Sequence, residues 1–222
     1  MDKIDITFPI EKALNILEKE YTKWNVPVVT LIALQSGSAF KVLLSTIISL
    51  RTKDEVTIEA SKRLYQLLKE PNDVYTVTIE DIERAIYPCG FYKRKSIQIM
   101  EICSRLVKDF NSKVPDDIDT LLDFPGIGRK TANLVVAEGH NLPALCVDVH
   151  VHRISNRFGY IITKNPDETE FLLRAHLDQS YWKKINYLMV AFGQAICRPM
   201  SPHCSKCPLV TMCKRVGVTK SR

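Results

Sequence analysis

The amino-acid sequence predicts an all-α protein, and two observations carry this prediction. Hydrophobic residues recur every three or four positions, with charged residues between them, in stretches around residues 13–24, 56–68 and 97–110. This is the period of an amphipathic helix. The clearest β-branched run, Val26–Ile32, has no partner of similar character, so it is better interpreted as an extended connection or the start of a helix.

Capping signals mark the ends of further helices. Pro71-Asn72-Asp73 stops one helix, while residues 114–117 and Asn165-Pro166-Asp167-Glu168 each supply a helix start. Neither an internal repeat nor a Gly/Ser linker divides the chain. Any second lobe must therefore be built from the two ends of the chain or from its last third.

Composition excludes several classes of protein. The chain has 222 residues, of which 45% are hydrophobic and 25% charged, as in ordinary globular proteins. It contains no apolar run long enough to cross a membrane, and its start does not resemble a secretory signal. We expect an intracellular location, in the cytoplasm or nucleoid, or in the nucleus if the organism is eukaryotic.

The basic excess is concentrated at the end of the chain. Overall, 31 Lys and Arg residues face 25 Asp and Glu residues. Residues 197–222 contain no acid and hold the whole excess in Arg198, Lys206, Lys214, Arg215, Lys220 and Arg222. Such a segment is either a solvated tail or a surface for a polyanion.

A glycine-containing turn between two short helices is the most informative stretch. The pattern predicts a helix over residues 119–123, a tight turn at residues 124–128, and a helix over residues 129–138 that ends at Gly139. Gly126 and Gly128 allow backbone amides to approach a large anion where the second helix presents its unpaired N–H groups. The turn is interpreted as a phosphate-binding hairpin, although a plain helix-connecting turn would have the same length.

Lys130 lies in the first turn of that second helix, beside Arg129. The positive end of the helix dipole and the adjacent cation disfavour an ammonium group, and partial burial would add to this effect. A neutral lysine can attack an aldehyde-like carbon to form a Schiff base. Lys130 is therefore a candidate nucleophile, with phosphate contact or simple solvation as the alternative.

Asp148 is the second candidate for chemistry. Its position predicts the N-cap of a helix that reaches Arg157. A carboxylate among apolar neighbours, here Val147 and Val149, can also stabilise a cation and relay protons. His150 and His152 follow two apart and would point to different faces of the helix, which argues against a metal site.

Four of the seven cysteines are close together, with the spacing C-x6-C-x2-C-x5-C. Clustered thiolates repel one another unless a cation neutralises them, so a metal site is a simpler explanation than free thiols. A single close pair with two outlying ligands favours a cubane iron–sulfur cluster over structural zinc, which usually takes two close pairs. The candidate ligands are Cys197, Cys204, Cys207 and Cys213, whereas Cys89, Cys103 and Cys146 are expected in the core.

The combined motifs resemble those of one protein family. The run from Phe124 to Asn133, the segment Val147-Asp148-Val149-His150 and the cysteine spacing are similar to those of the endonuclease III family of DNA glycosylases, within the helix-hairpin-helix superfamily. Further matches at residues 43–54 and 90–92 extend the resemblance over nearly the whole chain.

The resemblance implies a two-lobed, all-α fold. One lobe has six helices and spans residues 32–142; the other is discontinuous, combining residues 1–31 with 143–222, and carries a 4Fe-4S cluster in the loop 197–213. Duplex DNA with a damaged base or an abasic site would lie in the groove between them. We expect a monomer, with Gly126, Gly128 and Arg129 on the DNA backbone.

By position, Lys130 resembles the Schiff-base nucleophile of the family and Asp148 its partner carboxylate. This implies a bifunctional glycosylase and AP lyase of base excision repair that removes oxidised pyrimidines and cleaves the strand 3′ to the site. Where the family has a Gln and a Leu that fill the space left by the flipped base, this chain has Arg51 and Phe91. The alternatives are a mismatch glycosylase acting on thymine or uracil, and a non-catalytic DNA-binding module.

Overall fold

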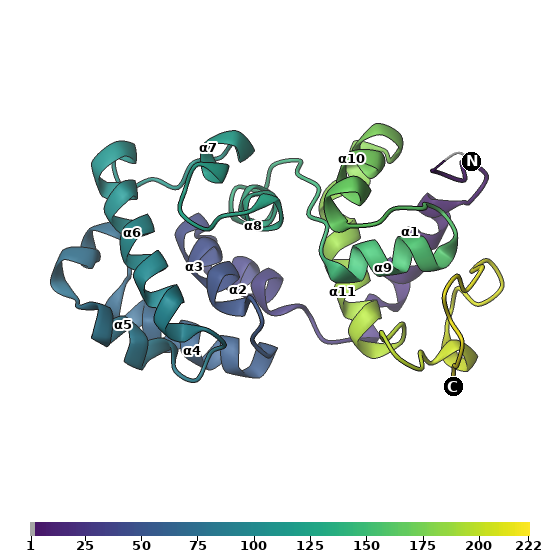
Figure 1. Cartoon of the computed structure of the whole chain (residues 1–222), viewed down its shortest axis with the longest axis horizontal. Helices are drawn as coiled ribbons and strands as arrows, with labels where there is room; N and C mark the ends of the chain where they lie inside the picture. Colours follow the sequence, from purple (N-terminus) through teal and green to yellow (C-terminus); the bar gives the residue numbers. More distant parts are fainter. Residues whose placement is uncertain (1–2) are drawn as a thin grey trace. The chain divides into compact units, whose positions relative to one another are not determined.

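The computed structural model describes residues 3–222, and within this range it contains helices and an isolated bridge between Ile4 and Ile161 but no strand. The prediction of an all-α protein is confirmed (Figure 1). None of the described helices is long and apolar enough to cross a membrane. The described chain divides into two compact units, Val28–Leu142 and the discontinuous Met1–Pro27 with Pro143–Arg222.

The unit Val28–Leu142 is built around one buried helix, α3. Nearly every residue from Phe40 to Ile48 is buried, and α3 contacts α2, α4, α6, α8 and the turn η3. Its buried hydroxyls, Ser45 and Thr46, both donate to the carbonyl oxygen of Val42, which satisfies them without leaving the helix. The elements of this unit are α2 (Val28–Ser36), α3 (Ala39–Ser49), α4 (Asp54–Leu67), η2 (Pro71–Thr76), α5 (Ile79–Ile86), α6 (Tyr92–Phe110), α7 (Ile118–Leu122), α8 (Arg129–Leu134) and the π-helical turn η3 (Val135–Gly139).

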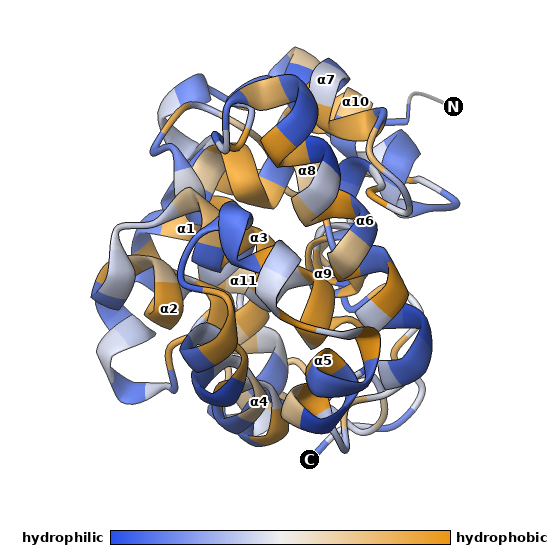
Figure 2. Cartoon of the chain, turned by 90° about the vertical axis from the view of Figure 1, so that its left-hand side faces the viewer, coloured by the Kyte–Doolittle hydropathy of each residue, from blue (hydrophilic) through white to orange (hydrophobic). Residues whose placement is uncertain are grey.

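The amphipathic pattern predicted for this unit is present. Hydrophobic and hydrophilic residues alternate along α4 and α5 (Figure 2). The run Val26–Ile32 is helical from Val28 onward, as the helix-start interpretation had it. Val28, Val29 and Ile32 are buried and α2 packs on α3, so tertiary burial outweighs the β propensity of these residues.

The helix after the glycine turn differs from the prediction. A regular α-helix over residues 129–138 was expected, but α8 ends at Leu134 and continues as the π-helical turn η3. Gly139 was expected to follow the end of the helix, yet it lies inside η3 and its φ is not positive. A Cβ on Gly139 would lie 3.0 Å from the Cα of Ala39, so this glycine allows η3 to approach the start of α3 closely.

The discontinuous unit has an aromatic core. Phe8 stacks on Phe158 with ring centroids 5.4 Å apart, and Trp24 packs on Phe192 at 5.6 Å. Asn165 caps α10 by accepting from the amide of Glu168, as its sequence signal predicted. The elements of this unit are α1 (Ile10–Glu20), η1 (Tyr21–Lys23), α9 (Val149–Phe158), α10 (Pro166–His176), η4 (Gln179–Tyr181), α11 (Trp182–Ala195) and η5 (Cys204–Lys206).

Candidate functional site

The glycine turn lies between α7 and α8. Gly126 has a φ of +67°, which a residue with a side chain adopts only with strain, and a Cβ there would lie 2.8 Å from Nε2 of Gln98. That Nε2 atom donates to the carbonyl oxygen of Pro125, 3.0 Å away, and so holds the turn in place. Gly128 is exposed and is the N-cap residue of α8. Because glycine has no side chain to cap the helix, the first amides of α8 remain accessible to an external acceptor.

Lys130 is the second residue of α8, as expected, but it is exposed. The partial burial considered from the sequence is therefore not present. Its neighbours Thr131 and Ala132 are buried, and Nδ2 of Asn133 donates to the carbonyl oxygen of Arg129. These contacts anchor the first turn of α8, in which Lys130 is an exposed residue.

Asp148 has the position that the sequence predicted for it. It is only 6% exposed, and its Oδ1 atom accepts from the amides of His150 and Val151 at 2.8 and 2.9 Å, which caps α9. Both of these bonds are made by Oδ1, so the capping of α9 uses one of the two carboxylate oxygens. The expected apolar shielding is present on one side only, because Val147 is buried whereas Val149 is 63% exposed.

The two histidines of α9 have separate partners. Nδ1 of His150 lies 3.1 Å from a guanidinium nitrogen of Arg153, and Nδ1 of His152 lies 2.8 Å from the hydroxyl of Thr169. Burial lowers the pKa of His152, which favours its neutral form. The two rings of α9 therefore have different surroundings.

Arg51 and Phe91 lie together at the surface of the unit Val28–Leu142. The guanidinium carbon of Arg51 is 5.5 Å from the centroid of the Phe91 ring, which is within range of a cation–π interaction. Phe91 is 60% exposed. Both residues have left-handed backbones, with φ values of 53° and 59°. Bulky residues adopt this conformation rarely, and it is found where surrounding structure over-determines it.

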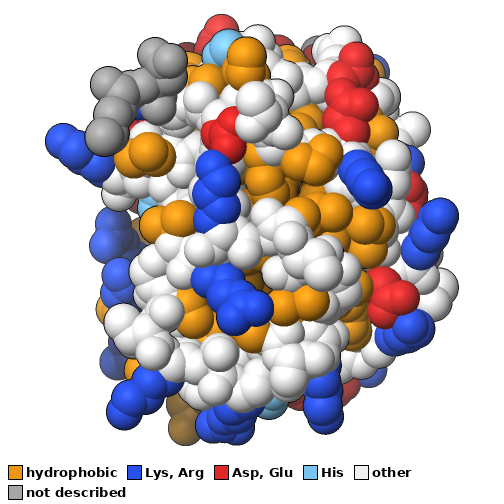
Figure 3. Space-filling model, turned by 90° about the vertical axis from the view of Figure 1, so that its right-hand side faces the viewer, with side chains coloured by type: hydrophobic (Ala, Val, Ile, Leu, Met, Phe, Trp, Pro, Cys, Tyr) orange, Lys and Arg blue, Asp and Glu red, His pale blue; other side chains and the backbone are white. Residues whose placement is uncertain are grey.

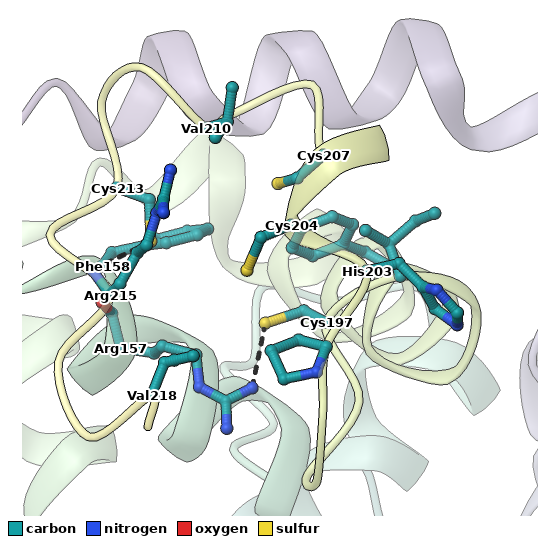
Figure 4. A pocket seen from close by; sticks show the side chains of 13 residues that line it. Arg157, Phe158, Cys197, His203, Cys204, Cys207, Val210, Cys213, Arg215 and Val218 are labelled. Atoms are coloured by element: carbon teal, nitrogen blue, oxygen red, sulfur yellow. Dashed lines mark hydrogen bonds between the residues drawn. The ribbon is translucent and has the colours of Figure 1, made fainter. Parts of the chain in front are cut away.

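The four clustered cysteines line one small pocket in the discontinuous unit (Figure 4). Within residues 3–222, no group of three or more Cys, His, Asp or Glu side chains converges as ligands of a single metal ion. Burial raises the pKa of Cys207 to about 11 and also raises the pKa of Cys213, so thiolates here require a compensating cation. The remaining cysteines, Cys89, Cys103 and Cys146, are buried, as predicted.

Hydrogen-bond donors already point at two of these sulfurs. Nη1 of Arg157 donates to Sγ of Cys197 over 3.3 Å, and the amide of Arg215 donates to Sγ of Cys213 over 3.4 Å. Cluster-bound thiolates accept hydrogen bonds of this kind, so the donor set fits an iron–sulfur cluster. Sequence reasoning missed Arg157, since nothing distinguishes it in sequence from a solvated charge on α9.

The basic residues of the tail are all exposed. Lys and Arg side chains are spread over the face of the molecule that Figure 3 shows. The side chains of two of the tail's basic residues have partners: Nε of Arg198 donates to the carbonyl oxygen of Gln194, and Nζ of Lys214 lies 2.5 Å from a carboxylate oxygen of Asp5. Lys214 therefore helps to attach the N-terminal segment to the loop that carries the cysteines.

Comparisons with known proteins agree with this arrangement. Residues 44–179 match the family described as HhH-GPD superfamily base excision DNA repair protein. Endonuclease III of Thermotoga maritima is 45% identical over 175 residues, which cover 79% of this chain and 82% of the relative.

Two solved structures extend the likeness to three dimensions. A trapped covalent intermediate of endonuclease III with DNA, an estranged-adenine complex, superposes with a TM-score of 0.83 at 31% identity and covers 93% of this chain and 94% of its own. A thermostable thymine-DNA glycosylase has a TM-score of 0.78 at 20% identity, covering 91% and 92%, and shares the fold.

Proposed function

Because this chain belongs to the endonuclease III family within the HhH-GPD superfamily, we propose that it removes oxidised pyrimidines from duplex DNA and then cleaves the strand. It is a bifunctional DNA glycosylase and AP lyase of base excision repair. The observation that carries the lyase activity is an exposed lysine in the first turn of the helix after the glycine hairpin, in a chain that superposes on a covalent enzyme–DNA intermediate.

In the proposed mechanism, the neutral amine of Lys130 donates its electron pair to C1′ of a nucleotide flipped out of the duplex. The N-glycosidic bond breaks, and the base leaves with the bonding electrons and takes up a proton. The sugar ring opens to a protonated Schiff base between Nζ and C1′. Loss of a proton from C2′ expels the 3′ phosphate by β-elimination, and water then releases the lysine.

Asp148 would act on the charged species of this sequence. A carboxylate that is only 6% exposed, and that caps α9 through Oδ1, can stabilise cationic character on the sugar and can accept or return protons. The amides at Gly126 and Gly128, with the cation of Arg129, would bind a backbone phosphate of the same duplex. We propose that the enzyme acts as a monomer.

Arg51 and Phe91 would fill the space left by the flipped nucleotide. A guanidinium can donate to the estranged base, and an exposed aromatic ring can wedge into the stack. Because the family has Gln and Leu at these positions, the chain's range of lesions is expected to differ from that of its relatives. This departure is also the observation that favours the second candidate function, excision of mispaired thymine or uracil.

A panel of duplexes, each with one lesion, tests the proposed substrate class. We expect base release from thymine glycol to exceed release from mispaired thymine or uracil by about tenfold or more, since one missing contact to a base is worth about that factor. Base release and strand scission should be measured separately on each duplex. A preference for mispaired thymine or uracil would replace the first candidate by the second, and absence of both activities with tight binding would indicate a non-catalytic module.

The family generally carries a 4Fe-4S cluster, and we propose that Cys197, Cys204, Cys207 and Cys213 hold one here. When bound, the cluster supplies a fixed shape for the loop 197–213. Leu209, within that loop, is fully buried, and Arg157 donates to the carbonyl oxygens of Arg198 and Pro199. Arg157, which contacts the start of the loop, and Leu209, within it, thus attach the loop to the core of the discontinuous unit.

Elemental analysis of the purified protein tests this assignment. We expect roughly four iron atoms and four acid-labile sulfides per chain. Cys207→Ser should lose most of the iron, whereas Cys103→Ala, at a buried cysteine outside the pocket, should retain it. Stoichiometric zinc without sulfide would contradict the proposal.

A further inference from the structure

A buried lysine of α6 that the proposed chemistry does not use lies beneath the Arg51–Phe91 pair. Lys95 is only 5% exposed. Its Nζ atom donates to the carbonyl oxygens of Ile48 and Leu50, both at 2.6 Å, and to the hydroxyl oxygen of Thr52 at 3.1 Å. An ammonium group has three donors, which match these three acceptors, whereas a neutral amine has two.

The first two acceptors belong to the end of α3. The last carbonyls of a helix have no amide partner within it, and a cation there also compensates the negative end of the helix dipole. Burial lowers the pKa of Lys95 to about 8, and the three oxygens act against this shift by favouring the charged form. Burial raises the pKa of the nearby Cys89 thiol, which favours the neutral thiol over a thiolate that could pair with Lys95.

The third acceptor connects two turns. The hydroxyl oxygen of Thr52 also accepts from the amide of Gly90, 3.1 Å away. A Cβ on Gly90 would collide with the carbonyl oxygen of Arg51, so only glycine allows the turns to approach this closely. Lys95 and Thr52 therefore join the turn that carries Arg51 to the turn that carries Phe91.

We propose that Lys95, acting through Thr52, is a positioning residue that holds Arg51 and Phe91 ready to enter the duplex and so sets the discrimination of the base opposite the lesion. Each member of the pair has a left-handed backbone, which persists only when surrounding contacts enforce it. The contacts that enforce it here are the hydrogen bonds of Lys95 and Thr52 and the close approach at Gly90. This inference rests on the proposed function of the pair.

The sharpest test changes Thr52, because Thr52→Val keeps the shape of the side chain and removes the shared oxygen. We expect base release from a lesion duplex to fall roughly tenfold, with loss of preference among opposite bases, since the buried Lys95 ammonium loses one of its three acceptors. When 2-aminopurine is placed opposite an abasic analogue, the change in its fluorescence on binding of Thr52→Val should be smaller than the change on binding of the wild type. Thr52→Ser, which restores the oxygen, should recover both, and Lys95→Met should resemble Thr52→Val.

Two controls separate this inference from the proposed function. Borohydride capture on a preformed abasic site should change less than threefold in Thr52→Val, because no base has to be released there; absence of capture in the wild type would reject the proposed function instead. Lys62→Met removes an exposed charge from the same unit and should behave as wild type. Unchanged opposite-base preference in Thr52→Val, or equal loss of base release and of capture, would overturn the positioning role.

Discussion

Replacing Lys130 by glutamine is expected to abolish covalent capture by borohydride on abasic DNA and to lower strand scission by at least about a thousandfold. Glutamine has a similar length but no amine that can attack C1′. The change lies on an exposed side chain, so the free energy of unfolding should change by no more than about 0.5 kcal/mol. Capture is measured as a slower-migrating enzyme–DNA band on a denaturing gel.

The matched control for Lys130 is Lys108→Gln, which removes another exposed lysine from the same unit. Both variants lose one positive charge, so both should weaken DNA binding by a similar small factor. Capture should disappear only in the Lys130 variant. Undiminished capture in Lys130→Gln would assign the nucleophile to a different amine and reject the proposed role of Lys130.

Replacing Asp148 by asparagine is expected to slow turnover roughly a hundred- to ten-thousandfold, the range typical for loss of a general acid or base. Asparagine is as good an N-cap as aspartate, so its side-chain oxygen should still accept from the amides of His150 and Val151. The start of α9 is thereby preserved while the carboxylate is lost. Single-turnover rates and DNA dissociation constants should be measured on the same duplex.

Asp178→Asn is the matched control for this second prediction. Asp178 also caps a helical turn of the discontinuous unit, by accepting from the amide of Ser180. It should show wild-type turnover. Were Asp148→Asn to lose binding and turnover to the same extent, its carboxylate would be a helix cap and nothing more.

The helices and their caps could be predicted from sequence because their causes are local. Apolar spacing indicated α1, α4 and α6, and Asn165 and Asp148 were identified as caps from their own residue type and the residues after them. The fold class and the family are also confirmed. They could be predicted because each motif that indicated them is a short contiguous stretch of the sequence.

The features that escaped prediction depend on contacts between distant residues. The π-helical turn η3 exists where Gly139 meets Ala39, a hundred positions earlier in the chain. In sequence, Lys95 is the third member of a basic run, Lys93-Arg94-Lys95, and only tertiary structure shows that it is buried while its neighbours are exposed. Counting the apolar neighbours of Asp148 in the sequence also could not show that Val149 is exposed while Val147 is buried.

The ion pair between Asp5 and Lys214, together with the bridge between Ile4 and Ile161, affects how the protein is made. On the ribosome, Val28–Leu142 has all of its internal partners soon after it emerges, and it can fold first. Asp5, in the segment that precedes it, can form its ion pair only after Lys214, 209 residues later, has been translated. Contacts between residues so distant in sequence form slowly, so we expect the apolar residues of α1 to remain exposed until the helices of the same core, up to α11, have been translated.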